Sequence, residues 1–254
     1  MLSSYMWSSE TGLKMEVIVP QKLAAVYAGD VSQALELIGI YSAHLCAYNE
    51  LSADILHDAL RFPLRLMKER LVEALVQRRI ALTYNAFLER SQQIDPSLRA
   101  AIFSAIDDLS IPASLIIAGF TDIRAEVALP RPEQKPLIFK IEYEAVKSEQ
   151  NFACVGDGAA AAELSLHRRK QSRFVKLPAT LYNVYEAKKL SEIARSVGST
   201  TDMLVIKPGS SRWVNGESIA ALDAYFDRYG PQSVGDLGMV SDPGKDVFYE
   251  DGLL

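Results

Sequence analysis

The chain has 254 residues, of which 49% are hydrophobic and 23% are charged, and its formal net charge is −5. This composition fits one folded globular protein and excludes disorder as its main state, because apolar residues are plentiful and the net charge is small. A pI near 5.4 argues against a general nucleic-acid binder, and no apolar run approaches the roughly 18 residues that span a bilayer, so we expect neither a nucleic-acid nor a membrane partner.

The first residues do not resemble a secretion signal. Residues 1–12 lack a basic region and a long apolar segment. Cys46 and Cys154 lie in apolar sequence contexts, so we expect both to be buried free thiols in a reduced cytoplasm. The three histidines, His44, His57 and His167, are not spaced like metal ligands. We therefore expect no metal and no cofactor.

The first predicted elements are a β-hairpin and a helix. Met15–Val19 and Leu23–Ala28 are short apolar runs separated by residues 20–22, which have the composition of a tight turn. Asp30 is a good N-cap for a helix that follows from Val31. By strand alternation, Lys14 shares a face with the partly polar residues of the first strand, and we expect it to line a groove between two sheets.

A second helix and three strands are predicted next. Ser52 caps a helical stretch that continues to Glu89, with a break or bend at Pro63 because proline lacks the amide hydrogen. Three β-like runs in succession predict an antiparallel meander. These runs are Ser114–Phe120, Pro136–Tyr143 and Phe152–Val155.

Helices return in the last hundred residues. We expect helices over 159–169 and 179–197, a strand at Met203–Ile206 and a final helix at Glu217–Arg228. The order of elements favours an α+β fold, a four-layer αββα sandwich with helix pairs outside two facing sheets, over a doubly wound parallel sheet. We assign residues 1–207 to this domain and 208–254 to a C-terminal helix and tail.

Four segments in this order resemble proteasome β-type subunits and their HslV-type relatives. The segments are residues 13–37, 114–122, 152–169 and 182–206, which include the motifs LKMEVIV, SLIIAGFTD, FACVGDGAAAAEL and SVGSTTDMLVI. The resemblance covers about residues 2–207. It implies the N-terminal-nucleophile (Ntn) hydrolase fold, in which the first residue of the mature chain, usually threonine, attacks a carbonyl and its α-amine accepts the proton.

The resemblance assigns the family's catalytic lysine to Lys14, followed fifteen residues later by Gly29. It also implies departures from an active site, because only thirteen residues precede Lys14, Tyr5 stands where an aspartate belongs, and Asp157 stands where serine is frequent. We therefore expect a catalytically degenerate protein that acts by assembly or binding.

Two alternatives retain activity. In one, processing exposes Ser3 or Ser4 as the nucleophile of a threonine/serine-type peptidase or amidohydrolase; in the other, a start upstream of Met1 supplies the nucleophile. As partners we expect further copies of the chain, in a dimer or ring formed through the first helix pair, or a protein or peptide. The apolar residues of these helices are too many for one buried stripe.

Overall fold

The computed structural model describes residues 14–48, 52–122 and 134–231. Within these ranges, seven strands form two antiparallel sheets. A five-stranded sheet has the order β1-β2-β3-β4-β5, and a two-stranded sheet pairs β6 with β7. The strands are β1 (Met15–Val19), β2 (Leu23–Gly29), β3 (Ala113–Asp122), β4 (Gln134–Glu142), β5 (Ala145–Glu149), β6 (Leu204–Lys207) and β7 (Ser210–Trp213).

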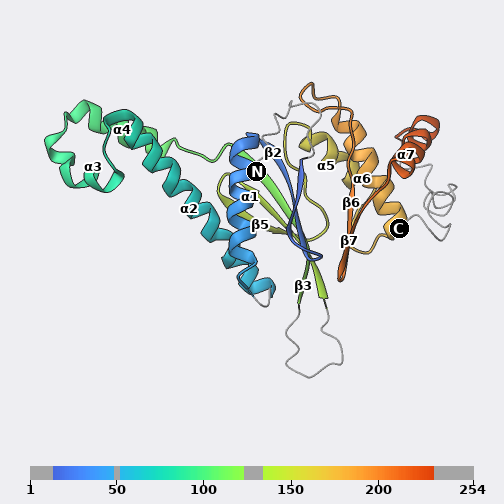
Figure 1. The fold of residues 1–254 in the computed structure, drawn as a ribbon. Coiled ribbons are helices and arrows are strands. Elements are labelled where there is room, and N and C mark those ends of the chain that lie inside the picture. Colours follow the sequence, from blue (N-terminus) through green and yellow to red (C-terminus); the bar gives the residue numbers. More distant parts are fainter. Residues whose placement is uncertain (1–13, 49–51, 123–133, 232–254) are drawn as a thin grey trace, which may run out of the picture.

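The helices lie outside the sheets, as Figure 1 shows. They are α1 (Val31–Leu45), α2 (Ala53–Ile80), α3 (Tyr84–Arg90), α4 (Pro96–Asp107), α5 (Ala159–Arg168), α6 (Leu177–Ser191) and α7 (Gly216–Tyr229). The first two cover one face of the five-stranded sheet, and β6–β7 with α6 and α7 lie on its other side. The predicted α+β class and four-layer αββα arrangement are therefore confirmed.

Local sequence signals explain where the first helices begin. The carboxylate of Asp30 accepts a hydrogen bond from the Gln33 amide at 2.9 Å, as predicted for an N-cap. Ser52 caps α2 through the Ile55 amide at 3.4 Å. Pro63 lies inside α2, which continues through it.

The large core lies between the five-stranded sheet and α1–α2. Alternate residues of β2, β3 and β4 point toward these helices, which contribute fully buried side chains such as Tyr41 and Leu45. The Tyr41 hydroxyl donates to the Leu60 carbonyl at 2.9 Å, so its polar atom is satisfied inside the core.

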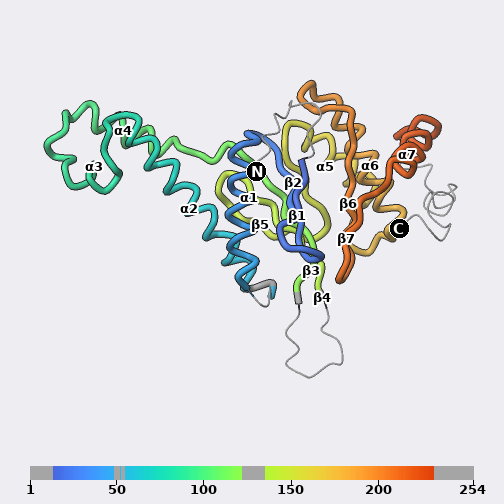
Figure 2. The backbone as a smooth tube through the Cα atoms, in the orientation of Figure 1, coloured from blue at the N-terminus to red at the C-terminus, as the bar shows by residue number. Residues whose placement is uncertain are grey.

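A helical arm extends away from the sheets, which the tube in Figure 2 makes easy to follow. The helical stretch from Ser52 to Glu89 was expected to break or bend at Pro63, but it is interrupted later. Helix α2 ends at Ile80, because Ala81 adopts a left-handed conformation, and Thr83 caps the separate helix α3. Helices α3 and α4, joined through the short helix at 91–93, pack against α2. These three helices bury Phe87 of α3 completely in a small separate core.

The third strand of the meander is also not where the sequence predicted it. Phe152–Val155 is not a strand; β5 is Ala145–Glu149, joined to β4 by the two-residue turn Tyr143-Glu144. Both turn residues have positive φ, the geometry of the tight hairpin turns that match strand twist. Phe152 and Cys154 instead pack beneath α5.

The second sheet extends beyond the predicted strand. The segment after Lys207 forms β7, which pairs with β6, so the domain boundary proposed after residue 207 lies in the turn of this hairpin. Cys154 is buried as expected, whereas the prediction for Cys46 is wrong because its residue is exposed near the end of α1. Across the described ranges, we find no helix with both the length and the apolar character that crossing a membrane requires.

Candidate functional site

The candidate site is the end of the five-stranded sheet where β2 terminates. Gly29 has φ of 93°, and a Cβ atom there would lie 2.4 Å from the Pro112 carbonyl oxygen, so glycine is required by both conformation and space. The Gly156-Asp157-Gly158 loop packs against the same end. A Cβ at Gly156 would lie 2.9 Å from the Cβ of Ala28. Glycines therefore let two loops approach the last residues of β2.

Asp157 joins this loop to the segment that follows α6. The Ser196 hydroxyl donates a hydrogen bond to the Asp157 carboxylate at 2.5 Å, and both residues are exposed. Asp157 does not cap α5, because Gly158 is the N-cap residue and no side chain caps the helix. The carboxylate bridges two loops instead of satisfying helix amides.

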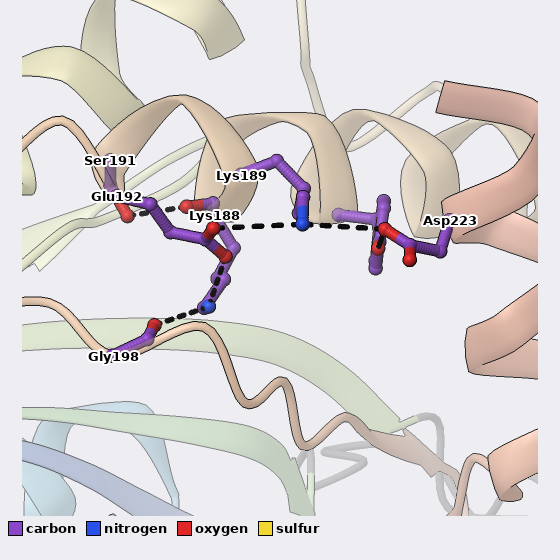
Figure 3. Close-up of polar contacts among 7 residues, drawn as sticks. Lys188, Lys189, Ser191, Glu192, Gly198 and Asp223 are labelled. Carbon is purple, nitrogen blue, oxygen red and sulfur yellow. Dashed lines mark hydrogen bonds and ion pairs between the residues drawn. The ribbon is translucent and has the colours of Figure 1, made fainter. Parts of the chain in front are cut away.

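A polar cluster at the end of α6 holds the loop that carries Ser196 (Figure 3). The Lys188 ammonium pairs with Glu192 at 2.5 Å and donates to the Gly198 carbonyl at 2.6 Å. Lys189 lies 3.5 Å from Glu192 and 3.3 Å from Asp223 of α7. These lysines thus tie the loop after α6 to the helix and tie α6 to α7.

Tyr185 belongs to the same contact between α6 and α7. Its hydroxyl donates to Asp223 at 2.5 Å. Burial raises the pKa of Tyr185, and the hydrogen bond to Asp223 raises it further. The same hydrogen bond lowers the pKa of Asp223. The hydroxyl is therefore held in its neutral, donating form.

Lys14 lies at the same sheet end as the glycine loop. Its carbonyl accepts a hydrogen bond from the Tyr27 amide at 3.1 Å, which places it opposite Tyr27 in the β1–β2 pair. Opposed residues of an antiparallel pair share a face, and Tyr27 belongs to the core beside α1. Lys14 is therefore exposed on the helix side of the sheet, not in a groove between the sheets as we expected.

The alternation itself was right, because Glu16 pairs with Ala25 and Ile18 lies in the same core beside α1. The error was to assign this face of β1 to the groove between the sheets. The two serines considered as nucleophiles, Ser3 and Ser4, lie outside the described residues. A catalytic role for Lys14, Ser3 or Ser4 stays a prediction.

A second titratable cluster lies between β4 and α5. Lys140 is 3.3 Å from Glu142 and 3.6 Å from Glu163. Burial opposes the charge of Lys140, but the two carboxylates outweigh burial and raise its pKa. Burial, with a further contribution from Glu163, raises the pKa of the nearby Cys154 thiol to about 11. This cysteine is therefore protonated at neutral pH and is a poor nucleophile.

The site offers an exposed carboxylate–hydroxyl pair and satisfied ion pairs. In the described part of the chain, no group of three or more histidine, cysteine or acidic side chains is arranged to hold a metal ion. Sequence reasoning missed Ser196, because its contact with Asp157 joins residues 39 positions apart. No short-range pattern marks such a pair.

Two antiparallel sheets between outer helices, with the glycine loop at one sheet end, form a proteasome-like αββα fold. Among solved structures, the chain is similar to Anbu (ancestral beta-subunit) from Yersinia bercovieri, with a TM-score of 0.53 and 11% identity over 91% of this chain and 86% of that one. It is also similar to a Gly-1 mutant of Anbu from Hyphomicrobium sp. strain MC1, with a TM-score of 0.52 and 12% identity over 90% and 85% of the two chains.

These comparisons correct the assignment made from sequence. No family model and no curated protein matches the chain. The structural neighbours are Anbu proteins, which are proteasome-like but distinct, so the assignment to the proteasome β-subunit and HslV-type family is wrong. At 11–12% identity, the likeness establishes the fold.

Proposed function

We propose that this protein is a non-catalytic member of the proteasome-like Ntn fold that acts by assembling with copies of itself, as a dimer or ring, or by binding a protein or peptide. The observation that carries the proposal is the engagement of Asp157 by Ser196 at the glycine loop. A carboxylate tied to a loop serine holds two loops together. It is not poised to activate a nucleophile, which needs a base within reach of the attacking atom.

Exposed apolar side chains on the helices support the assembly role. Phe62 and Tyr48 are about 40% exposed on the α1–α2 side, and three further large side chains are comparably exposed on the arm. Those on the arm are Leu88, Leu98 and Phe103. Surfaces of this kind are frequent at contacts between protein chains. Tyr41, Leu45 and Phe87 lie on the same helices but are buried within the chain, so they are not part of this surface.

The alternative is an active peptidase or amidohydrolase in which processing exposes Ser3 or Ser4 and the Lys14 ammonium favours the ionised nucleophile. The observation that favours it is that β1 starts beside the glycine loop, because Lys14 pairs with Tyr27 next to the Ala28–Gly156 contact. The two functions predict different behaviour toward an acylating reagent.

The first experiment measures the intact mass and N-terminal residue of the purified protein before and after treatment with a β-lactone acylating probe. We expect no covalent adduct at the N-terminal residue. An adduct on a newly exposed Ser3 or Ser4 that is lost in Lys14→Ala, but kept in the control Lys22→Ala, would establish the enzyme and overturn the non-catalytic proposal.

The second experiment tests assembly by analytical ultracentrifugation at micromolar concentration, neutral pH and moderate salt. We expect species larger than the 28.1 kDa chain. Replacing exposed Phe62 or Phe103 with serine should shift the distribution toward the monomer if those side chains form the contact. A clean monomer of the parent protein at all concentrations would refute the assembly role.

A further inference from the structure

A recess of about 160 Å³ lies on one face of the β6–β7 hairpin and is lined by Val205, Lys207, Ser210 and Arg212. The register pairs Val205 with Arg212 and Lys207 with Ser210. Because directly opposed residues of an antiparallel pair project from the same face, these four side chains share one face. Two cations and a hydroxyl therefore surround one small volume.

The two cations of this recess carry charge that the described residues do not neutralise. Lys207 and Arg212 are both exposed. Within 14–48, 52–122 and 134–231, neither forms an ion pair with a carboxylate. Two nearby positive charges repel each other, and a bound anion reverses the sign of that interaction. The chemistry of the recess thus suits an acidic ligand, although the chain as a whole is acidic.

The end of α7 lies on the same side of the hairpin as the recess. Val205, on the recess face, packs in one cluster with Leu222 of α7 and Tyr185 of α6. The Tyr182 hydroxyl donates to the Gly230 carbonyl at 3.3 Å and holds the end of α7 against α6. The segment that follows Pro231 therefore starts on the face where the cations are.

That segment has the charge and the length to occupy the recess. Residues 232–254 contain five acidic residues and one lysine. The acidic residues are Asp236, Asp242, Asp246, Glu250 and Asp251. At about 3.3 Å per extended residue, the first ten residues alone can cross about 30 Å, which exceeds the radius of a domain of this size.

We propose that residues 232–254 of the same chain dock in this recess through their acidic side chains, with Lys207 and Arg212 as the cationic partners. Docking neutralises two cations that no carboxylate of the described residues pairs with, at the cost of ordering a short segment. The inference is independent of whether the protein is catalytic.

Trypsin provides a direct test in the full chain, because Lys245 is the only lysine or arginine after Arg228. Cleavage there removes residues 246–254 and is followed by intact mass. A docked segment is cut only while it is released, so the rate follows the released population. In low salt, the double variant Lys207→Glu/Arg212→Glu should be cut about three- to tenfold faster than the parent, as the loss of two exposed ion pairs predicts.

Salt provides a second arm of the test. Added salt screens exposed charges, so 0.5 M sodium chloride should bring the cleavage rate of the parent close to that of the double variant. Both rates are normalised to the rate at which trypsin cuts an unstructured lysine peptide in the same buffer. The tail variant Glu250→Gln/Asp251→Asn should also be cut faster while leaving the hairpin intact, which covers the case in which the hairpin variant misfolds.

The control is Arg78→Glu/Arg79→Glu, which makes the same charge change at two exposed positions on the helical arm. It should be cut at the parent rate. Equal cleavage of the parent, hairpin and tail variants would overturn the proposal. Protection that grows with protein concentration would also overturn it, because the recess would then hold the tail of another copy. Equal acceleration of cleavage in the control variant would overturn it as well.

Discussion

The buried ion pair between Arg169 and Glu186 predicts a large and specific loss of stability. Both side chains are almost fully buried, at 8% and 4% exposure. The guanidinium donates to both carboxylate oxygens, with Nε 2.9 Å from Oε1. Ser165 donates to the same carboxylate at 3.3 Å, and the guanidinium lies over the Tyr182 ring. The hydrogen bond to Glu186 raises the pKa of Arg169.

Replacing only Arg169 with methionine leaves the Glu186 carboxylate buried without its cation. Removing one partner of a buried pair costs about 3–5 kcal/mol. At about 2–4 °C per kcal/mol for a chain of this size, the melting temperature should fall by roughly 6–20 °C. The double variant Arg169→Met/Glu186→Leu removes both charges and should recover most of the loss.

Urea denaturation and calorimetry would measure these changes, with Arg65→Met as the control. Arg65 pairs with Glu69, but the side chains are 71% and 65% exposed. Its loss should therefore cost no more than about 0.5 kcal/mol. The reasoning fails if Arg169→Met costs less than about 1 kcal/mol, or if the double variant is as unstable as the single one.

Three further predictions concern backbone, thiol and carboxylate. Gly29→Ala should lower the free energy of unfolding by at least about 1–3 kcal/mol from its positive φ alone. Gly39→Ala, in α1 with open space around its Cβ, should instead raise it by about 0.5–1 kcal/mol. Chemical denaturation distinguishes the two variants, and equal effects would contradict the close approach at Gly29. Iodoacetamide at pH 8 should modify Cys46 at once and Cys154 only on unfolding, because Cys154 is buried with its pKa raised to about 11. Mass spectrometry of peptides measures the modified fraction of each cysteine. Rapid modification of Cys154 would contradict its burial. The pKa of Asp223 is lowered in the folded state, so its stabilising contribution is present above the ordinary aspartate pKa of about 3.9 and is lost as pH falls through the folded-state pKa. Asp223→Asn should therefore flatten the acid side of a plot of unfolding free energy against pH. An unchanged plot would count against this role of Asp223.

Local signals in the sequence were sufficient for the elements that depend on neighbouring residues. Asp30 and Ser52 satisfy amides three residues away, and such caps are visible in any short window of sequence. The β1–β2 hairpin and the αββα layers follow from apolar runs and their order. The start of α6 at residue 177 places Pro178 in the first turn, where its missing amide hydrogen costs nothing.

The errors share a physical origin in contacts that sequence windows do not contain. Tyr143-Glu144 forms a tight turn without the glycine or asparagine that is usual there. No pattern in the sequence therefore indicated β5, and the third strand was predicted at the next apolar run instead. The run that contains Phe152 and Cys154 is apolar because these side chains are packed beneath α5, not because they belong to a strand. The site pair is the clearest case, because Asp157 and Ser196 meet only after α5 and α6 have packed together.

The length of α2 has a mechanical consequence. Its 28 residues correspond to a rod of about 42 Å, and one continuous backbone enters both the large core, through Leu60 and Met67, and the small core of the arm, through Val76. Lys68 fastens the middle of the rod to Glu144 in the β4–β5 turn at 2.6 Å. A load applied at the tip of the arm is therefore carried along α2 to the buried contacts of Leu60 and Met67 and to this ion pair. One continuous helix therefore couples any contact made by the arm to the packing against the five-stranded sheet.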